Sequence, residues 1–110
     1  MIIMCGVDIM KKWTAYKNGI TIGLTGPENG IITKDQEFNS GCRITLEQCS
    51  RYYAITCGIY GSMVHTVLCS SKESDDIFDS MKSELGKFMS IETTEDEEID
   101  FYNYFCNKYC

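Results

Sequence analysis

The spacing of hydrophobic and polar positions changes once along the chain, near Ser70. Before this point, short apolar runs alternate with turn residues or follow a period of two, which is typical of β-strands. After it, apolar residues recur every three or four positions, which is typical of amphipathic helices. The sequence therefore predicts a strand-rich segment over 13–69 and a helical segment over 71–109.

Turn residues divide the first segment into strands. Asn18-Gly19 lies between Trp-Thr-Ala-Tyr and Ile-Thr-Ile, and an Asn-Gly pair flanked by β-forming residues predicts a hairpin. A second turn signal, Gly26-Pro27-Glu28-Asn29-Gly30, precedes a third strand that begins at Ile31. The stretch 35–41 that follows is polar.

Residues 42–47 alternate between apolar and polar with a period of two. We expect the aliphatic members to face the core and the polar members to face water: Ile44 and Leu46 inward, and Arg43, Thr45 and Glu47 outward. The runs 53–59 and 63–69 are more continuously apolar, which indicates central strands covered on both faces.

Two capping boxes predict helix starts, Ser70 with Glu73 and Thr94 with Glu97. Apolar residues follow each at helical spacing: Ile77, Phe78, Met81, Leu85, Phe88 and Met89, then Ile99, Tyr102, Phe105, Cys106 and Tyr109. We therefore expect a single α+β domain over 1–110, with an antiparallel β-meander of about five or six strands and two C-terminal helices on one face. The first twelve residues fit either a further strand or a short helix.

Charge narrows the classes of partner. The 110 residues carry a net charge of −6. Residues 1–70 sum to +1 and residues 71–110 to −7, so the acidity belongs to the C-terminal third. An acidic surface repels phosphate backbones, so we expect no nucleic-acid partner and favour a basic protein surface.

Cysteine use indicates a reducing compartment. Six of the seven cysteines lie at positions 42–110, mostly inside apolar patterns, where a reduced thiol acts as a small hydrophobe. The N-terminal apolar run contains Asp8 and precedes Lys11 and Lys12, which is the reverse of a signal peptide. No run approaches the length of about 20 apolar residues that spans a membrane. We expect a cytoplasmic protein with free thiols and no membrane partner.

The stretch 55–69 contains the only histidine, His65, with Cys57 before it. If Tyr60-Gly61-Ser62 forms a hairpin loop, Cys57 and His65 become a cross-strand pair on one face. Such a pair can in principle give a thiolate nucleophile. A buried structural histidine fits the apolar surroundings better, so Cys57 and His65 stand as minor catalytic candidates.

Metal and phosphate sites are not expected. Zinc sites use close Cys or His pairs with four ligands, whereas the nearest spacings here are Cys57 to His65 and Cys106 to Cys110. The glycines around Gly26 precede a strand rather than a helix, so they are interpreted as turn residues and not as a phosphate loop. No cofactor is predicted. A glycine in a strand can mark a bulge or a close approach by another backbone or a ligand, and we interpret Gly58 and Gly61 as bulge and turn positions.

The acidic run 92–100 and the aromatic residues after it form the most distinctive surface feature. A solvated helix start explains the acids, and a docking surface for a basic partner or a second copy explains acids and aromatics together. The residues assigned to partner binding are Glu95, Asp96, Glu98, Asp100, Phe101 and Tyr104. We therefore expect a regulatory or protein-binding module of the inhibitor or immunity type. The alternative is a small enzyme or ligand-binding protein with a pocket near Cys57, Tyr60 and His65.

Overall fold

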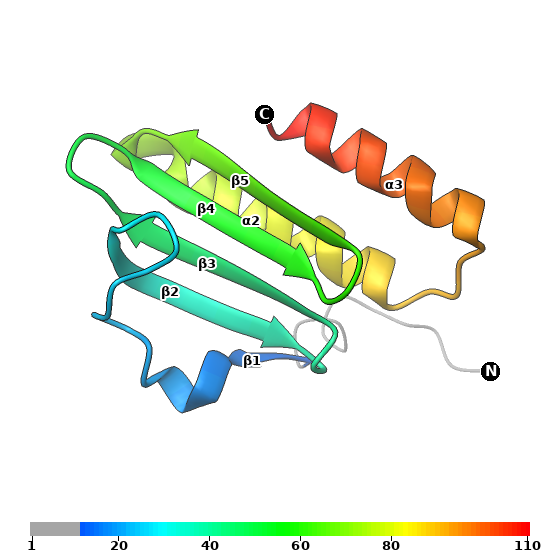
Figure 1. The fold of residues 1–110 in the computed structure, drawn as a ribbon, viewed down its shortest axis with the longest axis horizontal. Helices are drawn as coiled ribbons and strands as arrows, with labels where there is room; N and C mark the ends of the chain where they lie inside the picture. Colours follow the sequence, from blue (N-terminus) through cyan, green and yellow to red (C-terminus); the bar gives the residue numbers. More distant parts are fainter. Residues whose placement is uncertain (1–11) are drawn as a thin grey trace.

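The computed structural model describes residues 12–110, in which a five-stranded antiparallel sheet precedes two helices. Each strand pairs with the next along the chain, in the order β1-β2-β3-β4-β5. The elements are β1 (Trp13–Ala15), β2 (Ile31–Phe38), β3 (Cys42–Gln48), β4 (Tyr53–Ile59), β5 (Met63–Cys69), α2 (Ser71–Met89) and α3 (Glu95–Lys108). The predicted α+β meander is confirmed (Figure 1). The expectation for residues 1–11 lies outside the described residues.

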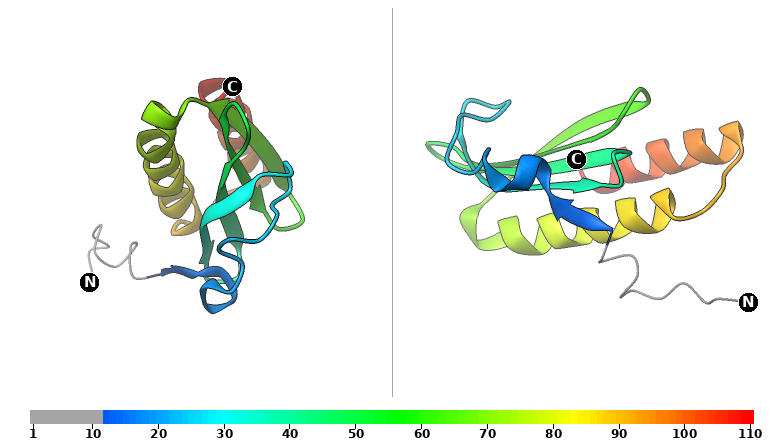
Figure 2. Two further views of the ribbon diagram at one scale, coloured as in Figure 1. Left: turned by 90° about the vertical axis from the view of Figure 1, so that its left-hand side faces the viewer. Right: turned by 90° about the horizontal axis from the view of Figure 1, so that it is seen from below.

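Both helices lie on one side of the sheet (Figure 2). α2 contacts β3 and β4, and its Phe78, Met81 and Leu85 are buried in the core. α3 runs alongside β5 (Figure 1), and Phe105 is its most deeply buried residue. We call the opposite face of the sheet, which neither helix covers, the outer face.

Strand alternation decides which side chains reach the core. Ile44 of β3 lies opposite Cys57 of β4, and Cys57 lies opposite His65 of β5, so these three side chains share the helix-covered face. The intervening residues belong to the outer face: Arg43, Thr45 and Glu47 of β3, Ala54, Thr56 and Gly58 of β4, and Val64, Thr66 and Leu68 of β5.

The expectation that the polar residues of β3 face water is wrong. Thr45 and Glu47 are buried and Arg43 is half-buried, because the loop over residues 16–30 folds across this part of the outer face (Figure 1). The period-two pattern separated the two faces correctly. It could not show that the polar face has a cover of its own.

The hairpin predicted at Asn18-Gly19 is also wrong. Residues 16–19 form a short 3-10 segment in which Lys17, Asn18 and Gly19 all have left-handed φ values of 45°, 58° and 84°. The strand before it, β1, pairs with the far end of β2, with Trp13 opposite Phe38. The tolerance of Asn and Gly for positive φ is therefore used in a left-handed turn that starts the loop.

Two strand assignments also change. β2 continues through the polar stretch to Phe38, because Arg43 and Thr45 of β3 and Thr21 of the loop supply hydrogen bonds to the buried carboxylate of Asp35. β5 is an edge strand, not a central one. Its outer-face residue Val64 is 78% exposed, so only its helix-facing side is covered.

Both predicted helix starts are confirmed. Thr94 and Glu97 form the complete capping box, whereas the Ser70 hydroxyl donates to the Glu73 carboxylate at 2.9 Å instead of capping the backbone. The predicted apolar stripe of α3 is wrong at Ile99, which is 50% exposed. The stripe begins instead at Phe101, which packs against the core.

Candidate functional site

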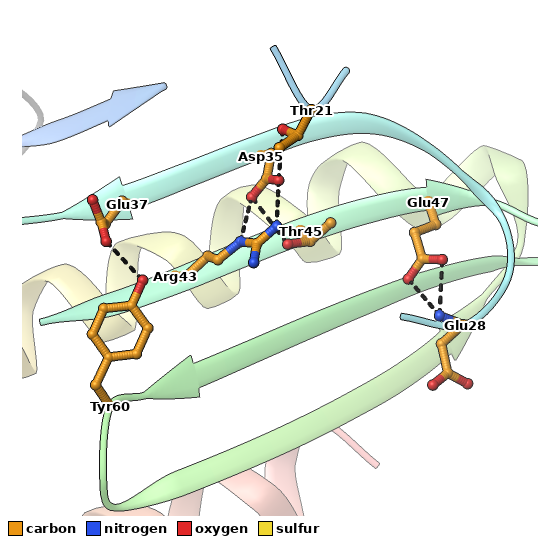
Figure 3. A network of polar contacts seen from close by, with 8 residues as sticks. All are labelled: Thr21, Glu28, Asp35, Glu37, Arg43, Thr45, Glu47 and Tyr60. Atoms are coloured by element: carbon orange, nitrogen blue, oxygen red, sulfur yellow. Dashed lines mark hydrogen bonds and ion pairs between the residues drawn. The ribbon is translucent and has the colours of Figure 1, made fainter. Parts of the chain in front are cut away.

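Asp35 is the centre of a polar network on the outer face (Figure 3). Its side chain is buried and accepts two hydrogen bonds from Arg43, from Nε at 2.8 Å and Nη2 at 2.6 Å. The hydroxyls of Thr45 and Thr21 donate to the same carboxylate, at 3.1 and 2.8 Å. Because Thr21 belongs to the covering loop, this network ties the loop to the sheet.

Glu47 is a second buried carboxylate and has a different partner set. It is 0% exposed and accepts backbone N–H groups of Glu28, at 3.0 and 3.2 Å, and Gly30, at 3.1 Å. No salt bridge reaches it among residues 12–110. Gly26 passes so close that an added Cβ would lie 2.4 Å from the carboxyl carbon. Charge-assisted bonds to the backbone therefore hold this carboxylate and the loop together.

A pocket of about 500 Å³ opens on the outer face beside this network. Residues from the loop, from β3, β4 and β5, and from the turn between β4 and β5 line it: Pro27, Arg43, Thr45, Thr56, Cys57, Gly58, Ile59, Tyr60, Gly61, Ser62, Met63 and Val64. Its volume falls within the range of small-molecule sites. By strand alternation Cys57, Ile59 and Met63 contribute backbone, since their side chains face the helices.

Hydrogen bonds and stacking fix two of the pocket's side chains. The Tyr60 hydroxyl donates to Glu37 at 2.7 Å, and burial together with this carboxylate raises the pKa of Tyr60 above its ordinary value. The Arg43 guanidinium lies 3.8 Å from the centre of the Tyr16 ring. Its hydrogen bonds to Asp35 raise the pKa of Arg43. The pocket therefore has preformed walls.

Gly58 forms part of the pocket floor, and the chain does not bulge there. Arg43, Gly58 and Val64 stand directly opposite one another in unbroken ladders. A Cβ at Gly58 would meet the Met63 carbonyl oxygen at 3.4 Å and a methyl of Val64 at 3.7 Å, both ordinary contacts. Neither a bulge nor crowding explains this glycine.

Cys57 and His65 are paired across the strands, in the register that the sequence left open. Burial raises the pKa of the Cys57 thiol to about 12, which opposes formation of a thiolate. A ring nitrogen of His65 is bonded to the backbone carbonyl of Tyr109, and the ring meets Phe105 edge-on. Both side chains lie on the helix side of the sheet, so they do not converge in the pocket near Tyr60.

The two C-terminal cysteines, Cys106 and Cys110, lie in different environments. The thiol of Cys106 contacts the Met63 sulfur at 3.9 Å, and Cys110 is exposed beyond the end of α3. Among residues 12–110 no three His, Cys, Asp or Glu side chains come together in a group able to hold a metal ion.

The predicted partner-binding residues share one helix and differ in exposure. Glu95, Asp96 and Asp100 are exposed, and we call these three with the half-buried Glu98 the acidic surface. The two aromatic residues of the set make contacts within the protein. Phe101 stacks on Phe88 with ring centres 4.0 Å apart. Tyr104 is half exposed, and its hydroxyl donates to Glu84 at 2.6 Å.

A second surface was not predicted from the sequence. Four large aliphatic side chains are exposed in the covering loop and at the first residue of β2, and we call them the aliphatic patch: Ile20, Ile22, Leu24 and Ile31. The first is 69% exposed. The sequence pattern predicts strands for all four residues, and one face of a strand is normally covered, but only Ile31 lies in one. Only the absence of a strand at 20–24 reveals the patch.

No helix among residues 12–110 is both long and apolar enough to cross a bilayer. No protein-family profile, curated protein or solved structure matches the chain.

Proposed function

We propose that the chain is a protein-binding module, of the inhibitor or immunity type, that docks a basic partner protein through the acidic surface of α3. The observation that carries the proposal is that the exposed carboxylates of α3 form no salt bridge with another described residue. Among the described residues none of the salt bridges involves a carboxylate from 92–100; they join Lys34 to Asp75, Arg43 to Asp35 and Lys108 to Glu84.

Two exposed aliphatic residues add an apolar component to this surface. Ile91 lies just before α3 and Ile99 lies in its second turn. Charges at the rim of an interface steer association, and apolar groups at its centre provide most of the affinity. An acidic surface that also contains exposed isoleucines therefore suits a basic partner with an apolar group at its binding surface.

The surroundings of the thiols support a cytoplasmic location. The six cysteines of the described chain are free, and Cys42 and Cys57 are buried. Free buried thiols are typical of proteins in reducing compartments. The acidic surface also disfavours nucleic acid. The proposal requires no cofactor.

The test compares two double variants with the same change in net charge. Glu95→Gln/Asp96→Asn removes two carboxylates from the acidic surface, and Asp76→Asn/Asp79→Asn removes two exposed carboxylates from α2. Each protein is immobilised and a partner is captured from native cytosol at low and high salt. We expect the α3 variant to lose capture and the α2 variant to keep it, with salt weakening capture by the wild type. Equal capture by both variants contradicts the proposal.

The aliphatic patch supports a second candidate, formation of a homodimer. Residues 20–31 carry a single charge, that of Glu28, whereas α3 is strongly acidic. Two copies with a net charge of −6 each repel one another least where their surfaces are neutral. Self-association is therefore expected through the aliphatic patch, leaving the acidic surface free for a different protein.

An enzyme working through Cys57 and His65 receives less support. The alternative required those side chains to converge in a pocket near Tyr60, and the pocket lies on the opposite face of the sheet. The raised pKa of Cys57 further disfavours nucleophilic attack by its thiol. The pocket itself remains a candidate for ligand binding without chemistry.

A further inference from the structure

We propose that the outer pocket binds a small planar aromatic compound that is neutral or positively charged. This inference does not depend on the docking function of α3, since the pocket lies on the other face of the sheet. It rests on four observations: an unexplained glycine in the floor, a short side chain beside it, apolar and aromatic walls, and the charges around them.

Gly58 is the first observation. A glycine inside a strand destabilises the sheet, because it gives up packing area and costs more chain entropy. At this position the backbone does not bulge, and a Cβ would meet its neighbours at 3.4 and 3.7 Å. The fold therefore accepts a larger residue here. What the glycine preserves is the space above the sheet, where a flat group can rest on the backbone.

The neighbour of Gly58 in the pocket lining is also short. Thr56 occupies the next outer-face position of β4 and lines the pocket, and its hydroxyl lies 3.2 Å from that of Thr66 and bonds to it. Arg43 on one flank of Gly58 and Val64 on the other are larger. At Gly58 the floor therefore lies lower than its two flanks, which suits a flat ring better than a branched chain.

The walls supply apolar and aromatic contact. Pro27, Tyr60 and Val64 line the pocket, and both Tyr60 and Val64 are exposed to solvent. The hydroxyl of Tyr60 is held by Glu37, so its ring loses little further freedom when a ligand binds. A second ring can stack on it or meet it edge-on.

Charge selects among ring compounds. Among residues 12–110 the one cation lining the pocket is Arg43, which is already paired with Asp35 through two hydrogen bonds. Glu37 has no salt bridge among the described residues and lies at the end of Tyr60. The net field at the pocket is therefore negative, which favours a cationic ring over an anionic one.

Three probes with one ring system and different charges test this inference: indole, tryptamine and indole-3-acetate. Each is titrated into the full-length protein while backbone amide resonances are followed by NMR. We expect indole and tryptamine to shift the amides of Thr56, Gly58 and Val64. Indole-3-acetate should bind at least about threefold more weakly than tryptamine, as a single poorly screened charge contact implies.

Two variants and one control fix the location. Gly58→Val fills the floor with a residue that suits a strand and should abolish the shifts. Val64→Lys adds a positive charge at the rim and should reverse the preference between tryptamine and indole-3-acetate, even if Gly58→Val does not fold. Leu68→Ala alters an exposed outer-face residue that does not line the pocket and should leave binding unchanged. Shifts that are absent for all three probes, that persist in a folded Gly58→Val protein, or that keep the wild-type preference in Val64→Lys overturn the proposal.

Discussion

His65 of β5 and Tyr109 at the end of α3 are joined by a hydrogen bond between the imidazole ring and the backbone carbonyl. The two residues are 44 positions apart, and the contact links the edge of the sheet to the last residues of the chain. The side chain of Tyr109 continues the link, since its hydroxyl donates to Glu84 of α2. One short segment therefore connects β5, α3 and α2.

Replacing His65 should weaken this link. His65→Leu keeps an apolar side chain beside Phe105 but leaves the Tyr109 carbonyl without its donor, at an expected cost of about 1–3 kcal/mol in the free energy of unfolding. His65→Gln, whose amide can still donate, should cost less. Denaturant unfolding measures both. Val64→Thr, at the exposed neighbouring position, is the control and should stay within about 0.5 kcal/mol. A His65→Leu protein as stable as wild type contradicts the structural role.

Glu47 should hold the covering loop. Glu47→Gln puts an NH₂ group among backbone N–H donors, so one or more hydrogen bonds to Glu28 and Gly30 are lost. We expect a loss of about 2–3 kcal/mol and faster hydrogen exchange at those two amides, while amides of β4 keep their protection relative to global unfolding. Gln48→Ala, at the exposed next residue, is the control. Unchanged exchange at Glu28 and Gly30 would show that the loop has other anchors.

Acid should weaken the contact between α2 and α3. Partial burial opposes ionisation of Glu84, but hydrogen bonds from Lys108, Tyr104 and Tyr109 outweigh it and hold the pKa of Glu84 below its ordinary value. The stability from this carboxylate is therefore complete above the pKa of an unfolded glutamate, about 4.3, and falls as the pH drops through the lowered folded value. Unfolding measured from pH 7 down to pH 2 should show a smaller acid-dependent loss for Glu84→Gln than for wild type. Parallel curves would mean that other groups dominate.

Thiol reactivity should separate core from surface. Burial raises the pKa values of Cys42 and Cys57 to about 12, so at pH 8 only about one such thiol in ten thousand is ionised. Cys110 is exposed. With iodoacetamide and mass spectrometry, we expect Cys110 to be alkylated in the native protein and Cys42 and Cys57 only after unfolding. Rapid native labelling of Cys57 would revive the catalytic interpretation.

The aliphatic patch should control self-association. Ile22→Ser/Leu24→Ser removes two exposed apolar side chains and should shift a dimer to monomer in analytical ultracentrifugation, with little change in thermal unfolding. Val64→Ser/Leu68→Ser, exposed residues of the outer face, is the matched control and should leave the oligomeric state unchanged. A wild-type protein that is monomeric at millimolar concentration rules out this role for the patch.

The sequence predicted what depends on local periodicity and capping. Phe78, Met81 and Leu85 follow the helical spacing and are buried, and Thr94 caps α3 as its box with Glu97 requires. These features depend on residues close together in the chain, so the pattern alone contains the information. The register that places Cys57 beside His65 stayed open, because a shift of one residue in the loop removes the contact, and the structure shows a three-residue loop between Ile59 and Met63.

The sequence could not predict what depends on long-range contacts. The carboxylates of Asp35 and Glu47 are bonded to groups 8–19 residues away, and nothing in the spacing shows that a polar strand face will be covered. The pocket beside Gly58 has the same origin, because its walls come from the loop, from β3 and from the turn after β4. The glycine was the one signal in the sequence, and its two interpretations could be separated only by the ladder register.

The covering loop takes its shape largely from the sheet and not from its own side chains. Glu47 binds it through the backbone N–H groups of Glu28 and Gly30. Any non-proline residue supplies this group at position 28, whereas a Cβ at position 30 would lie 2.8 Å from the Gln48 carbonyl oxygen, so the glycine is required there. Of the positions from 20 to 24, only Thr21 contributes a side-chain anchor. The exposed side chains of Ile20, Ile22 and Leu24 are thus open to replacement at little cost to the fold, so the chain can acquire a new binding specificity here by substitution, as a scaffold with a replaceable recognition surface.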